Sequence, residues 1–306
     1  LTYEPGNITS TVAFENTGDI SSTGDKNVGM YAKLAKNNAA YTTKNTGNIT
    51  LGNSASLSNP NVAMYTNATS TGTNPLINVG NITVGDNAVG MYGYEENSNG
   101  NITVGNGSIA MYSKGGNVNV AGSITTGNSG ESVGVYTVGN GQTITNNGTV
   151  SVTGKESVGA AALEGTITAA TGSISASGLS GITLYTGGTT GGTINAIGGT
   201  IDATNGAINV YADKGTINFN GATINTGASS LAFMKGGGAV NFNSATTANI
   251  ATNGTAFYIP PTVSPIPTTP TYSAFTGLTA TALTGFNNLN NLTLNMAANS
   301  NLAVAS

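Results

Sequence analysis

The sequence predicts an all-β protein that folds as a right-handed parallel β-helix, also called a β-solenoid. The first observation is an internal repeat with a period of about 24 residues, which is typical of solenoid architectures. The second is that each interval contains three short runs in which apolar and polar residues alternate, the pattern of strands with one buried face. The third is that short corners rich in Gly, Asn, Ser and Thr separate these runs, which leaves no room for crossover helices.

Two phrases define the repeat. Gly-Asn-Ile-Thr-Val occurs at 80–84 and 100–104, and an aliphatic–small pair followed by Met-Tyr occurs at 89–92 and 109–112. Aligning the chain on the tyrosine of the second phrase gives an anchor position in each interval: Tyr31, Tyr65, Tyr92, Tyr112, Tyr136, Ala161, Tyr185, Tyr211, Met234 and Tyr258. Roughly ten rungs are therefore expected, which at a strand spacing of about 4.8 Å make a rod roughly 50 Å long.

Strict alternation assigns the two faces of the third strand in each rung, the strand that carries the anchor. The inward set is predicted to contain Val133, Val135, Ile182, Leu184, Ile208, Val210, Leu231 and Phe233. The outward set is predicted to contain the anchor tyrosines together with Gly134, Thr183, Asn209 and Ala232. Because one rung cannot bury its inner face alone, stability is expected to come from contacts between neighbouring rungs.

The chain divides into three predicted segments. The β-helix is predicted over 1–259, with corner insertions at about 33–46 and 66–76. The proline-rich segment 260–272 is expected to be a linker or a further corner insertion, because proline lacks the N–H that a ladder needs. A loop or short helix and then a resumed rung are expected over 273–306. The chain starts without Met and without a signal peptide, so we expect a segment of a longer secreted protein.

Composition excludes several classes of function. Charged residues make up 7% of the 306 residues, and 8 basic residues stand against 12 acidic ones, so the basic stripe of a nucleic-acid-binding protein is missing. His and Cys are absent, which excludes a histidine-activated nucleophile and a thiolate zinc site. We therefore expect no catalysis, no cofactor and no metal. No apolar run reaches about 18 residues, so no membrane-spanning helix is expected.

The best-placed carboxylates are Glu131 and Glu156, which occupy the same register in consecutive rungs. Such a pair could bind Ca²⁺ or act as acid and base on a sugar, but we expect solvated corner residues whose repulsion Lys155 relieves. Glu95 and Glu96 are expected in an exposed loop, either solvated or in contact with a ligand. Asn-x-Ser/Thr sequons are frequent; we interpret them as composition, and a glycosylated protein is the alternative.

The repeated phrases also carry a resemblance. Val-Gly-Met-Tyr occurs at 28–31 and 89–92, and Gly-Asn-Ile-Thr occurs at 6–9, 47–50, 80–83 and 100–103. They resemble the passenger repeats of large fusobacterial type V autotransporter adhesins (the RadD-like group), over nearly the whole chain. The resemblance implies a cell-surface β-helix made with a signal peptide and a C-terminal outer-membrane barrel. It also implies coaggregation or host attachment through a surface protein or glycan of the partner, and it brings no catalytic motif.

The anchor tyrosines are expected to form an aromatic column with charged margins on one face of the rod. Aromatic surfaces with polar rims bind sugars or partner proteins, while the alternative is a purely structural ladder with charges that maintain solubility. If this face binds a ligand, the expected contacts are Tyr92, Tyr94, Glu95, Glu96, Tyr112, Lys114 and Tyr136. Beyond them Ala161 is expected to leave a notch one rung high.

Together these observations predict an extracellular, non-catalytic rod that displays or is itself a binding surface of an adhesin. One alternative is a polysaccharide-active β-helix enzyme or a tail-spike-like fragment. The lack of Arg and His and the scarcity of convergent acidic residues count against it. The other alternative is a structural coat or filament protein, in which stacked rungs simply propagate.

Overall fold

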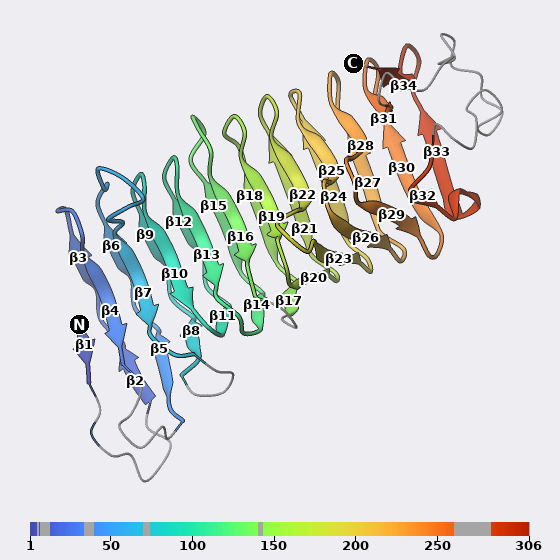
Figure 1. Ribbon diagram of the computed structural model, residues 1–306. Helices are drawn as coiled ribbons and strands as arrows, with labels where there is room; N and C mark the ends of the chain where they lie inside the picture. The colour runs from blue at the N-terminus through green and yellow to red at the C-terminus, as the bar shows by residue number, and fades with distance from the viewer. Residues whose placement is uncertain are drawn as a thin grey trace.

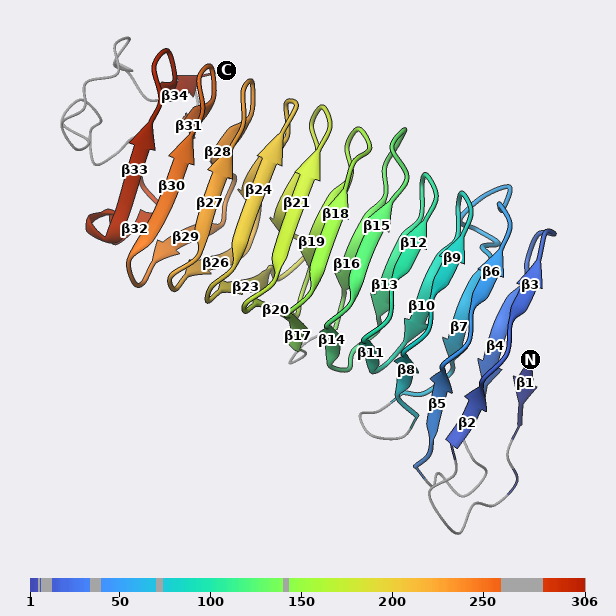
Figure 2. The same cartoon turned by 180° about the vertical axis from the view of Figure 1, so that it is seen from behind.

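The chain folds as a parallel β-solenoid, a rod in which three parallel sheets, here called A, B and C, run along its length (Figures 1 and 2). Successive strands belong to sheets B, C and A in that order, so each turn adds one strand to every sheet. In the described part of the chain the only helix is the short 3-10 helix η1 (Leu289–Asn291), and no helix there could span a membrane. The all-β parallel solenoid is confirmed. The computed structural model describes residues 1–4, 6, 13–33, 40–69, 74–139, 143–259 and 283–305.

Sheet A carries the anchor tyrosines and has 12 strands. They are β1 (Thr2–Tyr3), β4 (Val28–Ala32), β7 (Val62–Thr66), β10 (Val89–Gly93), β13 (Ile109–Ser113), β16 (Val133–Thr137), β19 (Val158–Ala162), β22 (Ile182–Thr186), β25 (Ile208–Ala212), β28 (Leu231–Lys235), β31 (Thr255–Ile259) and β34 (Asn301–Ala305). The anchors align between turns: Tyr92 pairs with Tyr112, and Ala161 pairs with both Tyr136 and Tyr185. The predicted repeat register is therefore correct along this sheet.

Sheets B and C have 11 strands each. Sheet B contains β2 (Ala13–Asn16), β5 (Thr42–Asn45), β8 (Leu76–Asn78), β11 (Glu96–Ser98), β14 (Val118–Val120), β17 (Thr143–Asn146), β20 (Thr166–Ala169), β23 (Gly192–Ala196), β26 (Gly215–Phe219), β29 (Ala239–Phe242) and β32 (Phe286–Asn287). Sheet C contains β3 (Ile20–Ser22), β6 (Ile49–Leu51), β9 (Ile82–Val84), β12 (Ile102–Val104), β15 (Ser123–Thr126), β18 (Thr149–Val152), β21 (Ser173–Ser177), β24 (Thr200–Thr204), β27 (Thr223–Thr226), β30 (Thr246–Ile250) and β33 (Leu292–Met296). Strands in both sheets alternate between buried and more exposed residues, as the period of two requires.

The strands of sheet A depart from this alternation at their second residue, which the pairing between neighbouring strands skips. We call this break in the alternation the bend. In β10, Val89 and Tyr92 line an outer groove, although Val89 is only 5% exposed, while Gly90 and Met91 are buried in succession. A Cβ atom at Gly90 would lie 2.9 Å from Cγ2 of the core residue Ile102. Two successive residues therefore point inward, and the first of them must be small in this part of the rod.

The bend overturns part of the face assignment made from strict alternation. Thr183, Asn209 and Ala232, which were predicted to face outward, are completely buried. The polar ones are accommodated by hydrogen bonds: Thr183 Oγ1 donates to the Asp202 carbonyl at 2.9 Å, and Asn209 Nδ2 donates to the Asn225 carbonyl at 2.9 Å. Gly134 is buried as well. The residues predicted inward at the start of these strands are only half-buried: Val133, Ile182, Ile208 and Leu231.

The second residue of each predicted inward pair is buried as expected: Val135, Leu184, Val210 and Phe233. The core around them changes in composition along the rod. Methionines of sheet A fill it in the early turns: Met30, Met64, Met91 and Met111. Aliphatic residues follow, and phenylalanines fill the core towards the C-terminal end: Phe219, Phe233, Phe242 and Phe257. Phe233 lies 5.3 Å from both Phe242 and Phe257, measured between ring centroids.

Insertions occur at corners of the rod, where added residues cost little closure entropy. The first predicted insertion, 33–46, contains strand β5, and its residues 34–39 lie outside the described part of the chain. The second predicted insertion, 66–76, has residues 70–73 outside the described part. A long corner at 52–61, between β6 and β7, was not predicted.

The rod resumes at its C-terminal end. The proline-rich segment 260–272 lies outside the described residues, as does 273–282 of the segment expected to hold a loop or short helix. After this interval β32 pairs with β29, β33 with β30 and β34 with β31. The solenoid therefore continues after this interval, which lies in the sequence between β31 of sheet A and β32 of sheet B.

Candidate binding face

The anchor tyrosines of sheet A stack in a column along the outer surface of the rod. Ring centroids lie 5.2 Å apart for Tyr31 and Tyr65, 5.3 Å for Tyr65 and Tyr92, 4.9 Å for Tyr92 and Tyr112, and 5.1 Å for Tyr112 and Tyr136. The two middle pairs are nearly parallel, with interplanar angles of 13° and 19°. Offset aromatic pairs contribute about 0.5–1.5 kcal/mol each beyond the area they bury. The column therefore holds neighbouring turns together.

An apolar groove of about 500 Å³ runs beside this column. We call it the tyrosine groove, and its lining residues are Val28, Tyr31, Leu57, Pro60, Val62, Tyr65, Val89, Tyr92, Ile109 and Tyr112. Val28 and Leu57 leave 41% and 43% of their surface exposed. Contiguous apolar surface of this kind on a protein marks an interaction site more often than scattered apolar residues do.

The Val-Gly-Met-Tyr phrase explains how the groove is built. Because the bend turns the second and third residues of each strand into the core, the first and fourth residues remain outside as two parallel walls. Valines and an isoleucine form one wall and tyrosines form the other. The corner at 52–61 adds Leu57 and Pro60. The sequence analysis identified the tyrosines but not the aliphatic wall. The aliphatic residue that recurs three positions before each of these anchors is the sequence signal that indicates this wall.

The hydroxyls of Tyr92, Tyr112 and Tyr136 stay neutral in the physiological pH range. Burial is the main cause that raises the pKa of Tyr92, Tyr112 and Tyr136 above its ordinary value. The neighbouring tyrosine of the column adds to the rise in each case. The groove thus presents hydroxyl groups, ring edges and aliphatic surface.

Lys114 is the predicted charged contact that lies beside the groove. Its Nζ atom lies over the ring of Tyr92, 5.3 Å from the centroid, a cation–π contact worth about 0.5–1 kcal/mol at an exposed site. Its side chain is exposed, and the ion pairs found among the described residues involve other lysines. Lys114 therefore provides a positive charge at the rim.

Glu96 lies in the interior of the rod, which corrects the prediction of an exposed loop. It has no exposed surface, and it stacks in β11 between Leu76 and Val118 of the adjacent turns. Neither carboxyl oxygen has a hydrogen-bond partner among the described residues. Burial raises the pKa of the Glu96 carboxyl well above its ordinary value. The Gly93 backbone amide, which approaches the carboxyl without the geometry of a regular hydrogen bond, lowers it to a smaller extent. Glu96 therefore cannot contact a ligand on the surface.

Tyr94 and Glu95 lie at the corner between sheets A and B, away from the groove lining. The ring of Tyr94 covers Gly115 in the next turn, where a Cβ atom would lie 2.8 Å from Cε2 of the ring. The backbone carbonyl of Glu95 accepts a hydrogen bond from the Leu76 amide at 2.9 Å. Of the seven predicted contacts, Tyr92 and Tyr112 line the groove, Tyr136 extends its column, and Lys114 borders it.

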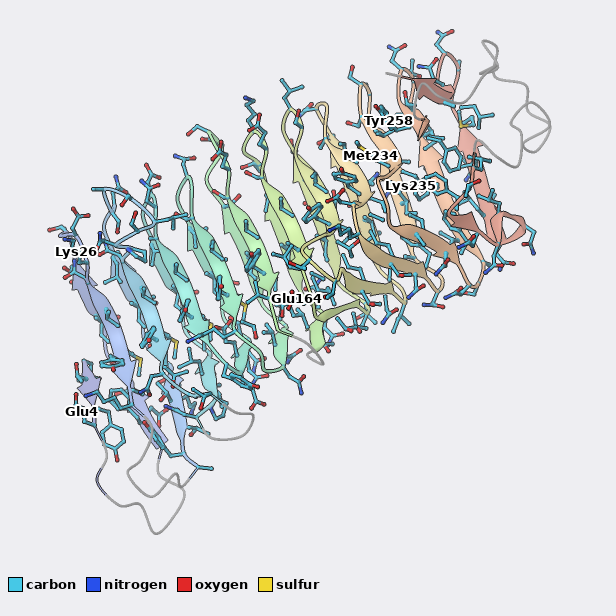
Figure 3. The ribbon with its side chains drawn as sticks, in the orientation of Figure 1. Glu4, Lys26, Glu164, Met234, Lys235 and Tyr258 are labelled. Atoms are coloured by element: carbon cyan, nitrogen blue, oxygen red, sulfur yellow. The ribbon has the colours of Figure 1, made fainter. Side chains whose placement is uncertain are left out.

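Ala161 interrupts the column as predicted, but the expected notch is not open to solvent. Ala161 is only 3% exposed, so neighbouring side chains cover it. The column resumes at Tyr185 and Tyr211, whose ring centroids lie 5.6 Å apart. Figure 3 shows Met234 and Tyr258 on the strands that follow.

The carboxylates of Glu131 and Glu156 lie at one corner of neighbouring turns, since the Glu131 amide donates to the Lys155 carbonyl at 2.9 Å. Both residues are exposed. The Nζ atom of Lys155 lies 2.8 Å from Oε1 of Glu156. Within the described ranges, no group of three or more His, Cys, Asp or Glu residues could hold a metal ion.

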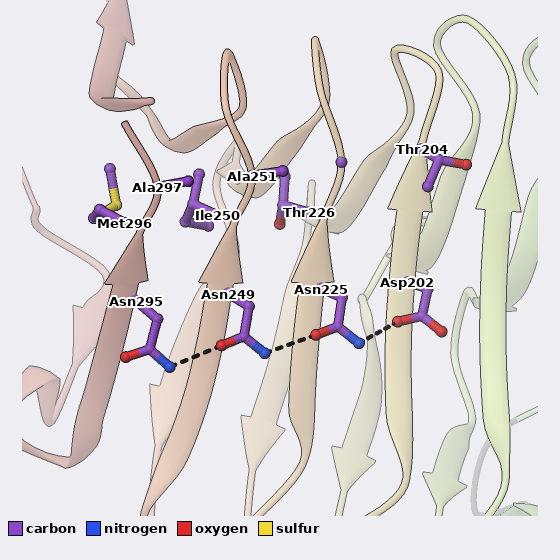
Figure 4. Close-up of a pocket in the computed structure, with 11 residues that line it drawn as sticks. Asp202, Thr204, Asn225, Thr226, Asn249, Ile250, Ala251, Asn295, Met296 and Ala297 are labelled. Atoms are coloured by element: carbon purple, nitrogen blue, oxygen red, sulfur yellow. Dashed lines mark hydrogen bonds between the residues drawn. The ribbon is translucent and has the colours of Figure 1, made fainter. Parts of the chain in front are cut away.

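A second hollow, of about 750 Å³, lies on the outer face of sheet C near the C-terminal end (Figure 4). A ladder of amides crosses it: Asn225 donates to Asp202 at 2.7 Å, Asn249 donates to Asn225 at 2.8 Å, and Asn295 donates to Asn249 at 2.8 Å. A similar ladder on sheet B joins Asn195, Asn218, Asn241 and Asn287. These bonds join one turn to the next, so the amides are engaged in holding the rod together.

Comparison of the chain with protein-family models, with curated proteins and with solved structures found no match.

Proposed function

We propose that this chain is an extracellular, non-catalytic rod that attaches one cell to another through the tyrosine groove. The observation that carries the proposal is a continuous apolar groove with exposed aliphatic side chains on a regular, largely polar scaffold. We further propose that the solenoid is a right-handed passenger segment of roughly ten rungs in an autotransporter adhesin of the RadD-like group. It would be anchored at the bacterial outer membrane through a C-terminal translocator and bind a surface protein or glycan of a host or partner bacterium.

The solenoid supports this proposal because it holds a binding surface on rigid strands. Each tyrosine of the groove is fixed by stacking on its neighbours and by backbone pairing with the turns on both sides. A preorganised aromatic surface loses little conformational entropy on binding, which favours affinity. No movement of the fold is needed to form the site.

A purely structural rod is the second candidate function. It is favoured by the amide ladders of sheets B and C and by the stacked tyrosines, which all connect one turn to the next. Under this alternative, the groove would be a by-product of stacking, and changes at its exposed side chains would not alter attachment.

The test uses the two most exposed aliphatic residues of the groove. Val28→Ser and Leu57→Ser together remove apolar surface without opening the core, because both side chains are more than 40% exposed. The matched control is Val79→Ser with Leu179→Ser, since these residues are 46% and 62% exposed and do not line the groove. Each version is displayed on the surface of a non-adherent bacterium, and attachment to partner bacteria and to epithelial cells is counted.

The proposal predicts that the groove variant loses most of its attachment and that the control retains it, with equal display and equal thermal stability of both. Equal attachment by the wild type, the groove variant and the control would contradict the proposal and favour the structural rod.

A further inference from the structure

We propose that the tyrosine groove takes an extended segment of a partner protein that carries large apolar side chains and a carboxylate, rather than a glycan. This inference rests on the proposed function and specifies the partner's chemistry at the same site. Three properties of the groove lead to it: the way its rings are covered, the shortage of hydrogen-bonding groups, and the position of its charges.

The rings in the middle of the column have no free face. Tyr92 is stacked on Tyr65 at 5.3 Å and on Tyr112 at 4.9 Å, so both faces of its ring are occupied. A sugar ring that stacks on an aromatic side chain needs such a face. The column instead presents ring edges to the groove, and the edge of an aromatic ring is its electropositive part. Carbonyl and carboxylate oxygens are therefore favoured over the apolar face of a sugar.

The lining offers few groups that could replace water around sugar hydroxyls. Its non-aromatic members are all valine, leucine, isoleucine or proline, and its only polar side-chain groups are the tyrosine hydroxyls. A glycan would lose hydrogen bonds to water on entering such a groove, and unreplaced hydrogen bonds are costly. Apolar side chains such as Leu or Phe lose nothing of this kind and gain from burial against Val28 and Leu57.

The dimensions suit an extended chain. The groove crosses four strands of sheet A, β4, β7, β10 and β13, and three strand spacings correspond to about 14 Å. An extended peptide rises about 3.3 Å per residue and directs alternate side chains to the same side, so about four or five residues would lie in the groove with two or three side chains facing it.

The charges around the groove complement an acidic peptide. Lys114 provides an exposed ammonium group at the Tyr92 rim. At the opposite corner the carboxylates of Asp25 and Asp86 already accept hydrogen bonds from backbone amides, at 2.9 Å and 2.7 Å. The carboxylate of the bound segment is therefore expected beside Lys114, away from the two aspartates.

The test pans the whole chain against a phage-displayed library of random twelve-residue peptides and, in parallel, probes an array of bacterial and host glycans. The variants are the groove pair Val28→Ser with Leu57→Ser, the control pair Val79→Ser with Leu179→Ser, and Lys114→Glu. We expect enriched peptides with at least two large apolar residues at alternate positions and an acidic residue. Their affinity is expected to fall at least tenfold in the groove pair, to stay unchanged in the control pair, and to fall in Lys114→Glu.

Three outcomes would overturn the inference. Glycans that bind the wild type and are lost in the groove pair would leave the proposed function standing and show that the partner chemistry is wrong. If the wild type sediments as a dimer and the groove pair sediments as a monomer, a second copy of the chain covers the groove. If the groove pair and the wild type bind the peptides equally, the groove is not the binding site of the peptides. If cell attachment also survives in the groove pair, the proposed function itself is contradicted.

Discussion

The carboxyl group of Glu96 lies beside Gly93, in the interior corner between sheets A and B. A Cβ atom at Gly93 would lie 3.5 Å from Oε1 of Glu96, and 3.0 Å and 3.1 Å from Thr66 and Leu76. The next turn carries Ser113 where this turn carries Gly93. The Glu96 carboxyl thus lies at ordinary contact distance from the position where a side chain at Gly93 would begin, in the same turn as Val89 and Tyr92 of the tyrosine groove.

This burial predicts a pH-dependent stability that depends on one residue. Because the folded state raises the pKa of Glu96, the folded protein binds a proton that the unfolded chain has lost above about pH 4.3. The free energy of unfolding is therefore expected to fall as pH rises from that value towards the raised pKa, by up to about 1.4 kcal/mol per pH unit. Urea unfolding of the wild type at pH 5 and pH 8 measures this loss.

Glu96→Gln keeps the shape of the side chain and removes its charge, so the difference in stability between the two pH values is expected to shrink. Glu131→Gln, at an exposed corner, serves as the control and is expected to keep the wild-type difference. The same pH dependence in Glu96→Gln as in the wild type would mean that Glu96 is not the group that titrates.

The bend of the sheet A strands predicts that two adjacent positions differ in how well they tolerate a substitution by aspartate. Asn209 is fully buried and hydrogen-bonded, while Ile208 is half-buried. Asn209→Asp places a carboxylate in the core and is expected to cost several kcal/mol, whereas Ile208→Asp leaves its carboxylate within reach of water and is expected to cost less. Thermal unfolding of both variants measures the two losses of stability. A larger loss of stability in Ile208→Asp than in Asn209→Asp would support the face assignment made from strict alternation.

The aromatic part of the core near the C-terminal end is expected to make a large contribution to the stability of the fold. Phe233 packs against Phe219, Phe242 and Phe257 with ring centroids 5.3–6.1 Å apart. Phe233→Ala is expected to lower the free energy of unfolding by about 3–5 kcal/mol. The exposed Leu179→Ala provides the comparison and is expected to change it by less than about 0.5 kcal/mol. Similar losses in the two variants would contradict this packing.

The fold was predictable because its signals are periodic. The recurring Met-Tyr phrase fixed the register of sheet A, and the pairing of Tyr92 with Tyr112 follows from it. The bend was not predictable from alternation, because Gly90 and Met91 are buried at consecutive positions, which a regular strand with one buried face does not allow. Thr183 and Asn209 also look like surface residues by type, and the acceptors that bind their side-chain donors come from segments 16 to 19 residues away.

The candidate site was predictable only in part. The tyrosines were found through the repeat, whereas the wall that faces them depends on the bend and on the corner at 52–61. By residue type Glu96 is expected at the surface, because charged residues are seldom fully buried. In the folded chain its carboxyl lies beside Gly93, and neither residue type signals this burial in the sequence.

If the tyrosine groove is the attachment site, a cross-linker placed in it must reach the partner. A photo-crosslinking benzoylphenylalanine can replace Leu57, which is 43% exposed in the groove, or Leu179, which is 62% exposed elsewhere. After illumination of attached cells, the account predicts a covalent adduct of the displayed chain with a partner molecule at position 57 and none at position 179. An adduct at 179 with none at 57, while attachment is retained in both variants, would contradict it.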